Sequence, residues 1–205
     1  MQSNPYTQTN AKMSIIIVYR RAQVFSDRCL EIACGEFTHC EIFDPYIGGT
    51  FVTSVDYGMQ LRFDIKQLYH SDHKNYAWQI VKLTKFEYDR MLKWNIQQVE
   101  NHCKYNYSDL LWQITPFISS YVPDVADALH PNKMFCSQAA VLALRAAIGD
   151  DSTHQMREFV SSMNSRLTTP MHLQKAIYMY TGRSFSDKPV PTSLHSVDRN
   201  ATEPL

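Results

Sequence analysis

The sequence predicts one α+β domain in which helices pack on an antiparallel sheet of about five strands, counted from the periodic segments. Three observations carry this prediction. Short β-branched or alternating segments, separated by turns, fill residues 14–83. Two helix-start signals follow at Thr84 and Thr169. An Ala- and Leu-rich run before Gly149 has the composition of a helix that ends at a glycine.

The strands are predicted first from hydrophobic pattern. Residues 14–19 are β-branched, which is typical of a buried strand, and residues 37–43 alternate as in a half-buried strand. A Pro- and Gly-containing turn at 44–49 separates them from a hairpin that bends at 56–58. The five candidate strands are residues 14–19, 37–43, 50–55, 59–63 and 76–83.

The helices are predicted from periodicity and capping residues. Thr84 and Glu87 form a capping box, and Pro170 occupies the first position of a helix that ends by Gly182. The candidate helices are residues 25–34, 84–102, 108–114, 136–148 and 170–181. In the second of these we expect Phe86, Met91, Leu92, Ile96 and Val99 to face inward.

Composition limits the functions that the chain can have. The 205 residues carry 20 basic and 20 acidic side chains, so there is no net charge to attract nucleic acid or an anionic membrane. No apolar run is long enough for a membrane helix. Five scattered cysteines without C-x-x-C spacing favour a reducing, cytoplasmic location over a disulfide scaffold. Their spacing to histidines fits no common zinc pattern, so we expect no metal and no cofactor.

Polar segments flank the domain. Residues 1–12 are predicted to form a flexible arm, and residues 13–183 the folded domain. Residues 184–205 are polar and rich in proline, which is typical of a disordered or partner-bound tail. The two polar ends are therefore candidate sites for protein assembly partners.

Cys136 is the leading candidate for a catalytic residue. It precedes the helical run at 139–148, so the sequence places it at a helix N-terminus. Unpaired backbone N–H groups and the helix dipole favour negative charge there and make a thiol a better nucleophile. The alternative is a small buried residue in an apolar helix, because free cysteine is among the most buried residue types.

The strand at 37–43 supplies a candidate partner for this thiol. Alternation puts His39, Glu41 and Phe43 on one face, and Thr38, Cys40 and Ile42 on the other. A cysteine and a histidine are the minimal pair for thiol catalysis, and a third polar group orients the ring.

Several segments together resemble a known family. They are the helix, glycine turn and strand at 25–39, and the segments Tyr105–Leu111, Phe135–Gln138 and Thr168–Leu173. In this order they are similar to the circularly permuted NlpC-like, papain-fold cysteine hydrolases, including relatives of lecithin:retinol acyltransferase and members from large DNA viruses. The resemblance covers about residues 13–182. It implies a permuted papain-like fold and a Cys136–His39 pair.

The resemblance also frames two open questions. Many permuted relatives carry the orienting acid on the next strand, where this chain has Ser54, so Glu41 or Asp56 is the nearest acidic substitute. The expected function is a thiol hydrolase or acyltransferase that cleaves an amide, ester or thioester. The alternative is a catalytically degenerate fold in a structural or interaction protein, such as a minor virion component. Tyr105 and Tyr107 are expected to border a cleft for a peptide or acyl-bearing substrate.

Overall fold

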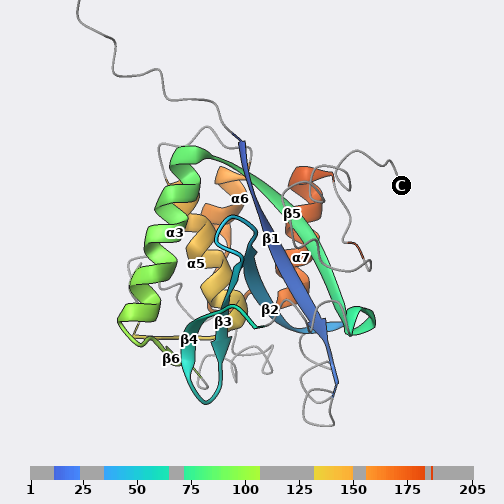
Figure 1. Ribbon diagram of the computed structural model, residues 1–205. Helices are drawn as coiled ribbons and strands as arrows, with labels where there is room; N and C mark the ends of the chain where they lie inside the picture. The colour runs from blue at the N-terminus through green and yellow to red at the C-terminus, as the bar shows by residue number, and fades with distance from the viewer. Residues whose placement is uncertain are drawn as a thin grey trace, which may run out of the picture.

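The computed structural model describes residues 12–23, 35–64, 72–106, 132–149, 156–182 and 186. Its centre is an antiparallel sheet in the order β4-β3-β2-β1-β5 (Figure 1). The strands are β1 Lys12–Arg21, β2 Phe37–Asp44, β3 Gly49–Ser54, β4 Gly58–Arg62 and β5 Tyr76–Thr84. All five predicted strands are confirmed, and the domain is α+β.

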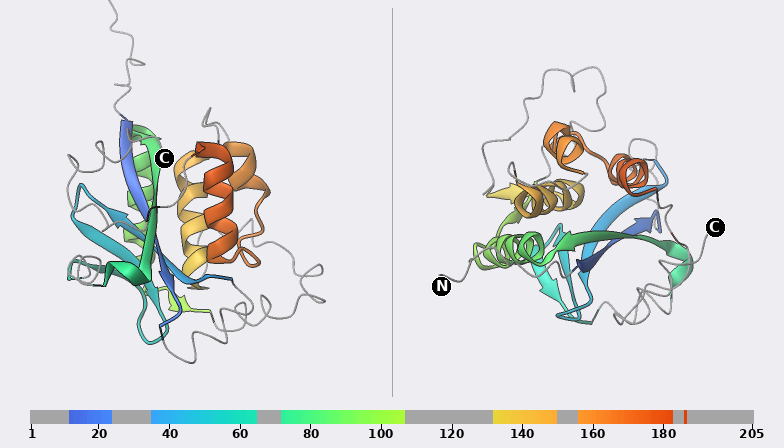
Figure 2. Two further views of the ribbon diagram at one scale, coloured as in Figure 1. Left: turned by 90° about the vertical axis from the view of Figure 1, so that its right-hand side faces the viewer. Right: turned by 90° about the horizontal axis from the view of Figure 1, so that it is seen from above.

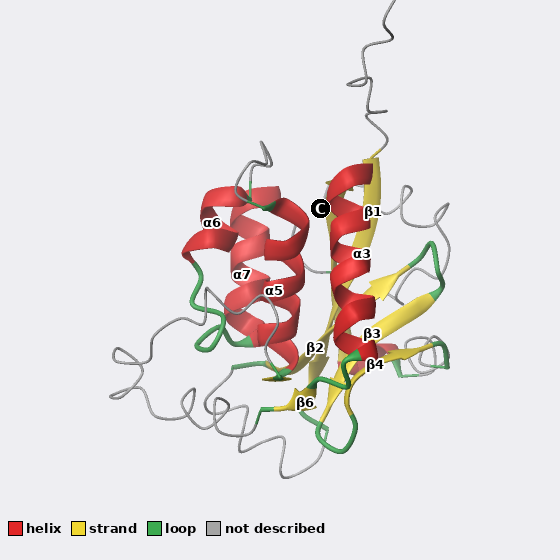
Figure 3. Ribbon diagram, turned by 90° about the vertical axis from the view of Figure 1, so that its left-hand side faces the viewer, coloured by secondary structure: helices red, strands yellow, loops and turns green. Residues whose placement is uncertain are grey.

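The helices lie on one side of this sheet, as Figure 2 and Figure 3 show. They are α3 Lys85–Glu100, α5 Cys136–Ile148, α6 Arg157–Ser162 and α7 Pro170–Thr181, with a short 3₁₀ turn η1 at His73–Asn75. A parallel pair, β6 Lys104–Tyr105 and β7 Lys133–Met134, forms a second small sheet. The sequence did not predict α6, β6 or β7, because elements this short show no measurable periodicity.

Capping residues start two of the helices as predicted. Thr84 Oγ1 accepts the N–H of Glu87 at 3.2 Å, and Glu87 Oε2 accepts the N–H of Thr84 at 2.8 Å, which completes the capping box. Thr169 Oγ1 likewise accepts the N–H of His172, with Pro170 at the first helical position. Gly149 follows α5, but its φ of 60° and ψ of 173° lie outside the left-handed helical region that its position suggested.

The predicted buried face of α3 is partly wrong. Phe86 and Ile96 are 53% and 39% exposed, whereas Met91 is fully buried. The observed inner face also uses polar and aromatic side chains, namely Glu87, Tyr88, Trp94, Asn95 and Gln98. These positions recur with the helical period, but the apolar pattern alone did not reveal them.

The strand β1, which lies between β2 and β5, is buried on both faces. Ile15, Ile17 and Tyr19 join the main core between sheet and helices. Ile16 and Val18 join a second cluster with Phe43, Val52, Tyr76, Trp78 and Ile80. A continuous apolar strand thus carries two alternating faces, each buried in its own cluster.

Some sequence predictions fall outside the described residues. These are the helices at 25–34 and 108–114, Tyr107, and residues 1–11 of the arm. Within the predicted tail, Ser186 is described. Its N–H donates to the Trp78 carbonyl at 2.9 Å, and its carbonyl accepts the Trp78 N–H at 3.0 Å, so this residue is attached to β5.

Candidate active site

Cys136 is the first residue of α5, where the sequence placed it. The residue before it, Phe135, adopts an extended conformation, and its fully buried side chain gives the helix no cap. Threonine hydroxyls cap α3 and α7 instead. Phe135 thus supplies no side-chain acceptor to the first-turn N–H groups of α5, the helix that starts with the candidate nucleophile.

A β-bulge shapes the strand that faces this helix start. The β1–β2 register pairs Arg20 with His39 and Arg21 with Phe37, which leaves Thr38 as the extra residue. Phe37 therefore lies in the main core with Cys40 and Ile42, although strict alternation would put it with His39. The bulge sits immediately before the histidine, which is a common place to redirect a side chain next to a site.

The bulged end of β2 brings the predicted pair together. The Cys136 sulfur interacts with the His39 ring and with the side chain and backbone N–H of Cys40. Cys136 is 4% exposed, and the His39 side chain is 13% exposed. The β2–β3 register covers only Ile42–Asp44, so this contact lies beyond the stretch that pairs with β3.

The electrostatics of the pair favour a charged nucleophile. The hydrogen bond from Cys40 lowers the pKa of Cys136 most, and the charge of His39 lowers it further, against burial, so that it lies well below its usual range. Burial lowers the pKa of His39, but the charge and hydrogen bond of Cys136, with Glu41, outweigh it and raise that pKa to about 10. Both shifts favour a thiolate–imidazolium pair over a neutral thiol and imidazole.

Glu41 is the acidic residue that contacts the histidine. His39 Nε2 lies 3.0 Å from Glu41 Oε1, and both side chains are largely buried. This contact occupies Nε2 and leaves Nδ1 as the ring nitrogen for the thiol. Of the other two candidates, Ser54 has a buried hydroxyl without a hydrogen-bond partner among the described residues, and Asp56 lies in an exposed turn.

Tyr105 lies beside the strand that leads into the nucleophile. In the β6–β7 pair it is opposite Met134, and the N–H of Asn106 donates to the Met134 carbonyl at 3.2 Å. Tyr105 is half-buried. The structure thus places it near the start of α5, where a cleft was expected, while Tyr107 lies outside the described residues.

Two features near the site were missed by sequence reasoning. Cys40 was assigned to the strand face away from His39, yet it contacts the same thiol. The start of α7 also joins the site, because Ser137 Oγ donates to the Thr168 carbonyl at 2.6 Å. A Cβ on Gly35, whose φ is +82°, would stand 2.6 Å from Met171 Sδ, so α7 packs directly on the turn before β2. The adjacency of Cys40 to His39 was the available signal.

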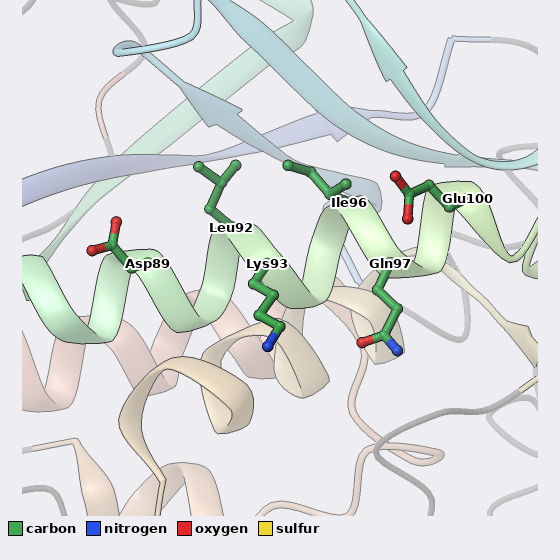
Figure 4. A pocket seen from close by; sticks show the side chains of 6 residues that line it. All are labelled: Asp89, Leu92, Lys93, Ile96, Gln97 and Glu100. Carbon is green, nitrogen blue, oxygen red and sulfur yellow. The ribbon is translucent and has the colours of Figure 1, made fainter.

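No group of three or more His, Cys, Asp or Glu side chains in the described ranges is placed to hold a metal ion. A surface hollow of about 520 Å³ runs along α3 and is lined by Asp89, Leu92, Lys93, Ile96, Gln97 and Glu100 (Figure 4). All six residues belong to one face of one helix, and none belongs to the Cys136 site.

In the part of the chain that the structure describes, every helix is too short or too polar to cross a membrane. No family model, curated protein or solved structure matches the chain. The function of the chain is therefore inferred from the geometry of the Cys136 site.

Proposed function

We propose that the chain is a cysteine hydrolase or acyltransferase with a permuted papain-like arrangement, acting on an amide, ester or thioester. The observation that carries the proposal is the contact of Cys136 with His39, which Glu41 holds from the other side. The histidine strand precedes the nucleophile helix in the chain, as the permuted arrangement requires.

The proposed reaction begins with attack by the thiolate. Cys136 Sγ forms a bond to the substrate carbonyl carbon, and the carbonyl electrons move to its oxygen. The N–H groups at the start of α5, to which Phe135 supplies no side-chain acceptor, are the proposed donors to this oxygen. His39 then donates its proton to the leaving nitrogen, oxygen or sulfur as the bond to carbon breaks.

The second half of the reaction regenerates the thiolate. His39, now neutral, takes a proton from water or from another acyl acceptor, which attacks the thioester carbon. The carbon–sulfur bond breaks, and Cys136 leaves as the thiolate that His39 again balances. Water as acceptor gives hydrolysis, and an alcohol or amine gives acyl transfer.

The surroundings favour an uncharged substrate. The chain has no net charge, and the half-buried ring of Tyr105 lies next to the strand that ends at the nucleophile. Aromatic walls suit an acyl chain or a peptide side chain better than a polyanion. We therefore propose peptides or acyl esters as the substrate class.

Labelling with iodoacetamide tests the activated thiol. At pH 6 a free cysteine is only about 0.3% thiolate, whereas Cys136 should be mostly thiolate. A low-pKa thiolate is a weaker nucleophile, so the net expected gain is about tenfold or more over free cysteine. Peptide mapping would identify the labelled residue, with Cys136→Ser as the blank.

A substrate screen completes the test. Acyl esters and short peptides should be turned over by the wild type and not by Cys136→Ser. Labelling of Cys136 no faster than free cysteine, together with equal background turnover by both proteins, would overturn the proposal and favour a catalytically inactive fold.

A further inference from the structure

The side chain of Cys40 forms and breaks no bond in the proposed reaction, although it lies against the nucleophile and donates a hydrogen bond to it. Both cysteines belong to the main core, with Cys40 1% and Cys136 4% exposed. The Cys40 thiol and its backbone N–H interact with the Cys136 sulfur. Neither cysteine is in a disulfide. Two buried thiols thus share one contact at the centre of the site.

We propose that Cys40 and Cys136 are a reversible oxidation site, at which a small peroxide converts the pair to a disulfide and switches the thiol chemistry off. This proposal rests on the proposed function, because it uses the same activated Cys136. It adds to that function a second residue, a reactant class and a mode of regulation.

The first step is oxidation of the nucleophile. The Cys136 thiolate attacks one oxygen of the peroxide, so a sulfur–oxygen bond forms, the oxygen–oxygen bond breaks, and hydroxide leaves. The hydroxide takes a proton and departs as water. From an alkyl hydroperoxide the leaving group is instead an alkoxide, which departs as the alcohol. Among thiols, those with thiolate character react fastest, so Cys136 is oxidised before a cysteine whose pKa burial has raised.

The second step uses Cys40 as the resolving thiol. Its sulfur attacks the sulfenic sulfur of Cys136, the sulfur–sulfur bond forms, and the sulfur–oxygen bond breaks. The proton of Cys40 leaves with that oxygen as water. The peroxide is thereby reduced and the two cysteines are oxidised. The sulfurs must close to about 2.05 Å, a small movement for side chains that are already in contact.

Burial explains why this partner and not an external thiol resolves the oxidised cysteine. The Cys40 thiol already contacts the Cys136 sulfur, whereas an external thiol must first enter a site in which that residue is 4% exposed. Cys103, the remaining cysteine in the described ranges, contacts its own neighbour Lys104 and packs on Gly58. It therefore serves as a matched buried control.

The test treats the purified full chain with hydrogen peroxide and then maps its peptides without reductant. The expected product has lost two hydrogen atoms and contains a linked pair of peptides carrying Cys40 and Cys136. Dithiothreitol should restore labelling of Cys136 by iodoacetamide. Cys103→Ala should behave in the same way as the wild type.

The variant Cys40→Ala removes the resolving thiol. Its Cys136 should gain two oxygen atoms as a sulfinic acid, and dithiothreitol should not restore labelling. Cys40→Ser is a second variant that keeps a polar atom at this position. A wild type that gains oxygen without forming the linked peptides, or that links Cys136 to another cysteine, would overturn the proposal.

The two proposals fail in distinguishable ways. Slow labelling of Cys136 in the reduced protein would overturn the proposed function before any peroxide is added. Fast labelling followed by sulfinic acid formation in the wild type would leave the nucleophile standing and overturn only the switch. The linked peptides are measured directly and do not depend on finding a substrate.

Discussion

The strand β2 carries two buried carboxylates, Glu41 near its middle and Asp44 at its end, and the two have different partners. Glu41 is 8% exposed and contacts His39, which in turn contacts the Cys136 thiol. Asp44 is fully buried and accepts hydrogen bonds from the backbone N–H groups of Tyr46 and Ile47 and from the Tyr88 hydroxyl.

The difference lies in what each carboxylate binds. Asp44 binds two backbone amides and a hydroxyl, which close the β2–β3 turn and attach α3 to the sheet. Glu41 contacts an imidazole that also contacts the Cys136 thiol, so its charge acts on groups that exchange protons in the proposed reaction. Burial alone therefore does not mark a functional carboxylate, and the partners decide the role.

The largest expected effect comes from a change at His39, which contacts both Glu41 and Cys136. His39→Ala removes the group that balances the thiolate and protonates the leaving group. We expect turnover to fall by about 10²- to 10⁴-fold, the usual contribution of a positioned acid–base group. Iodoacetamide labelling at pH 6 should fall about tenfold or more, because the pKa of Cys136 returns toward that of free cysteine.

Asp44→Asn is the matched control for this change. It keeps the shape of a buried side chain on the same strand and should leave labelling of Cys136 unchanged. Equal losses in the two variants would mean that the site responds to any disturbance of β2, and the comparison would fail.

The sequence predicted the elements better than the contacts between them. Alternation and β-branching identified β1 to β5, and threonine caps located α3 and α7, because these signals are local. The bulge at Thr38 left no such signal, and alternation did not reveal that Cys40 contacts the same thiol as His39. The choice of Glu41 over Ser54 also depended on a contact between side chains, which strand spacing permitted but did not determine.

At the structural end of β2, Asp44→Ala should destabilise the fold. The change leaves the Tyr88 hydroxyl and two turn amides without their acceptor in a buried place, which costs about 2–4 kcal/mol. Thermal unfolding would measure this loss. Below the unfolding temperature, the labelling rate of Cys136 should match that of the wild type; a tenfold change would contradict the structural assignment.

Glu41→Gln should have a smaller effect that appears in the pH profile. Turnover by the wild type should be flat from below neutral pH up to the pKa of His39, about 10, because His39 must carry the proton that it gives to the leaving group. At lower pH turnover should fall as Cys136 gains a proton. The hydrogen bond and charge of Glu41 both raise the pKa of His39. Their loss should move the upper limit down by about 1–3 pH units.

Turnover by the same variant should fall about tenfold, the effect of one pKa unit of lost interaction. Glu41→Asp keeps the charge and should restore part of the upper limit. An unchanged upper limit in Glu41→Gln would show that the contact with His39 is only structural, like that of Asp44.

The smallest expected effect comes from Tyr88→Phe, which removes one donor to Asp44 and nothing from the site. Burial raises the pKa of Asp44, and the Tyr88 hydrogen bond lowers it. Without this donor the pKa rises further, so the folded state is destabilised where Asp44 is charged. We expect a loss of about 1 kcal/mol near neutral pH, or about 2–4 °C in melting temperature.

This loss should shrink as pH falls through the raised pKa of Asp44, because a neutral carboxyl depends less on the missing donor. Tyr46→Phe is the control, since its hydroxyl accepts the N–H of Ser14 at 3.0 Å and this hydrogen bond involves no carboxylate. Its cost should be independent of pH in the same range. A pH-independent loss in Tyr88→Phe would show that Asp44 stays charged throughout. A changed labelling rate of Cys136 in this variant would show that the surroundings of Asp44 and of Glu41 are coupled.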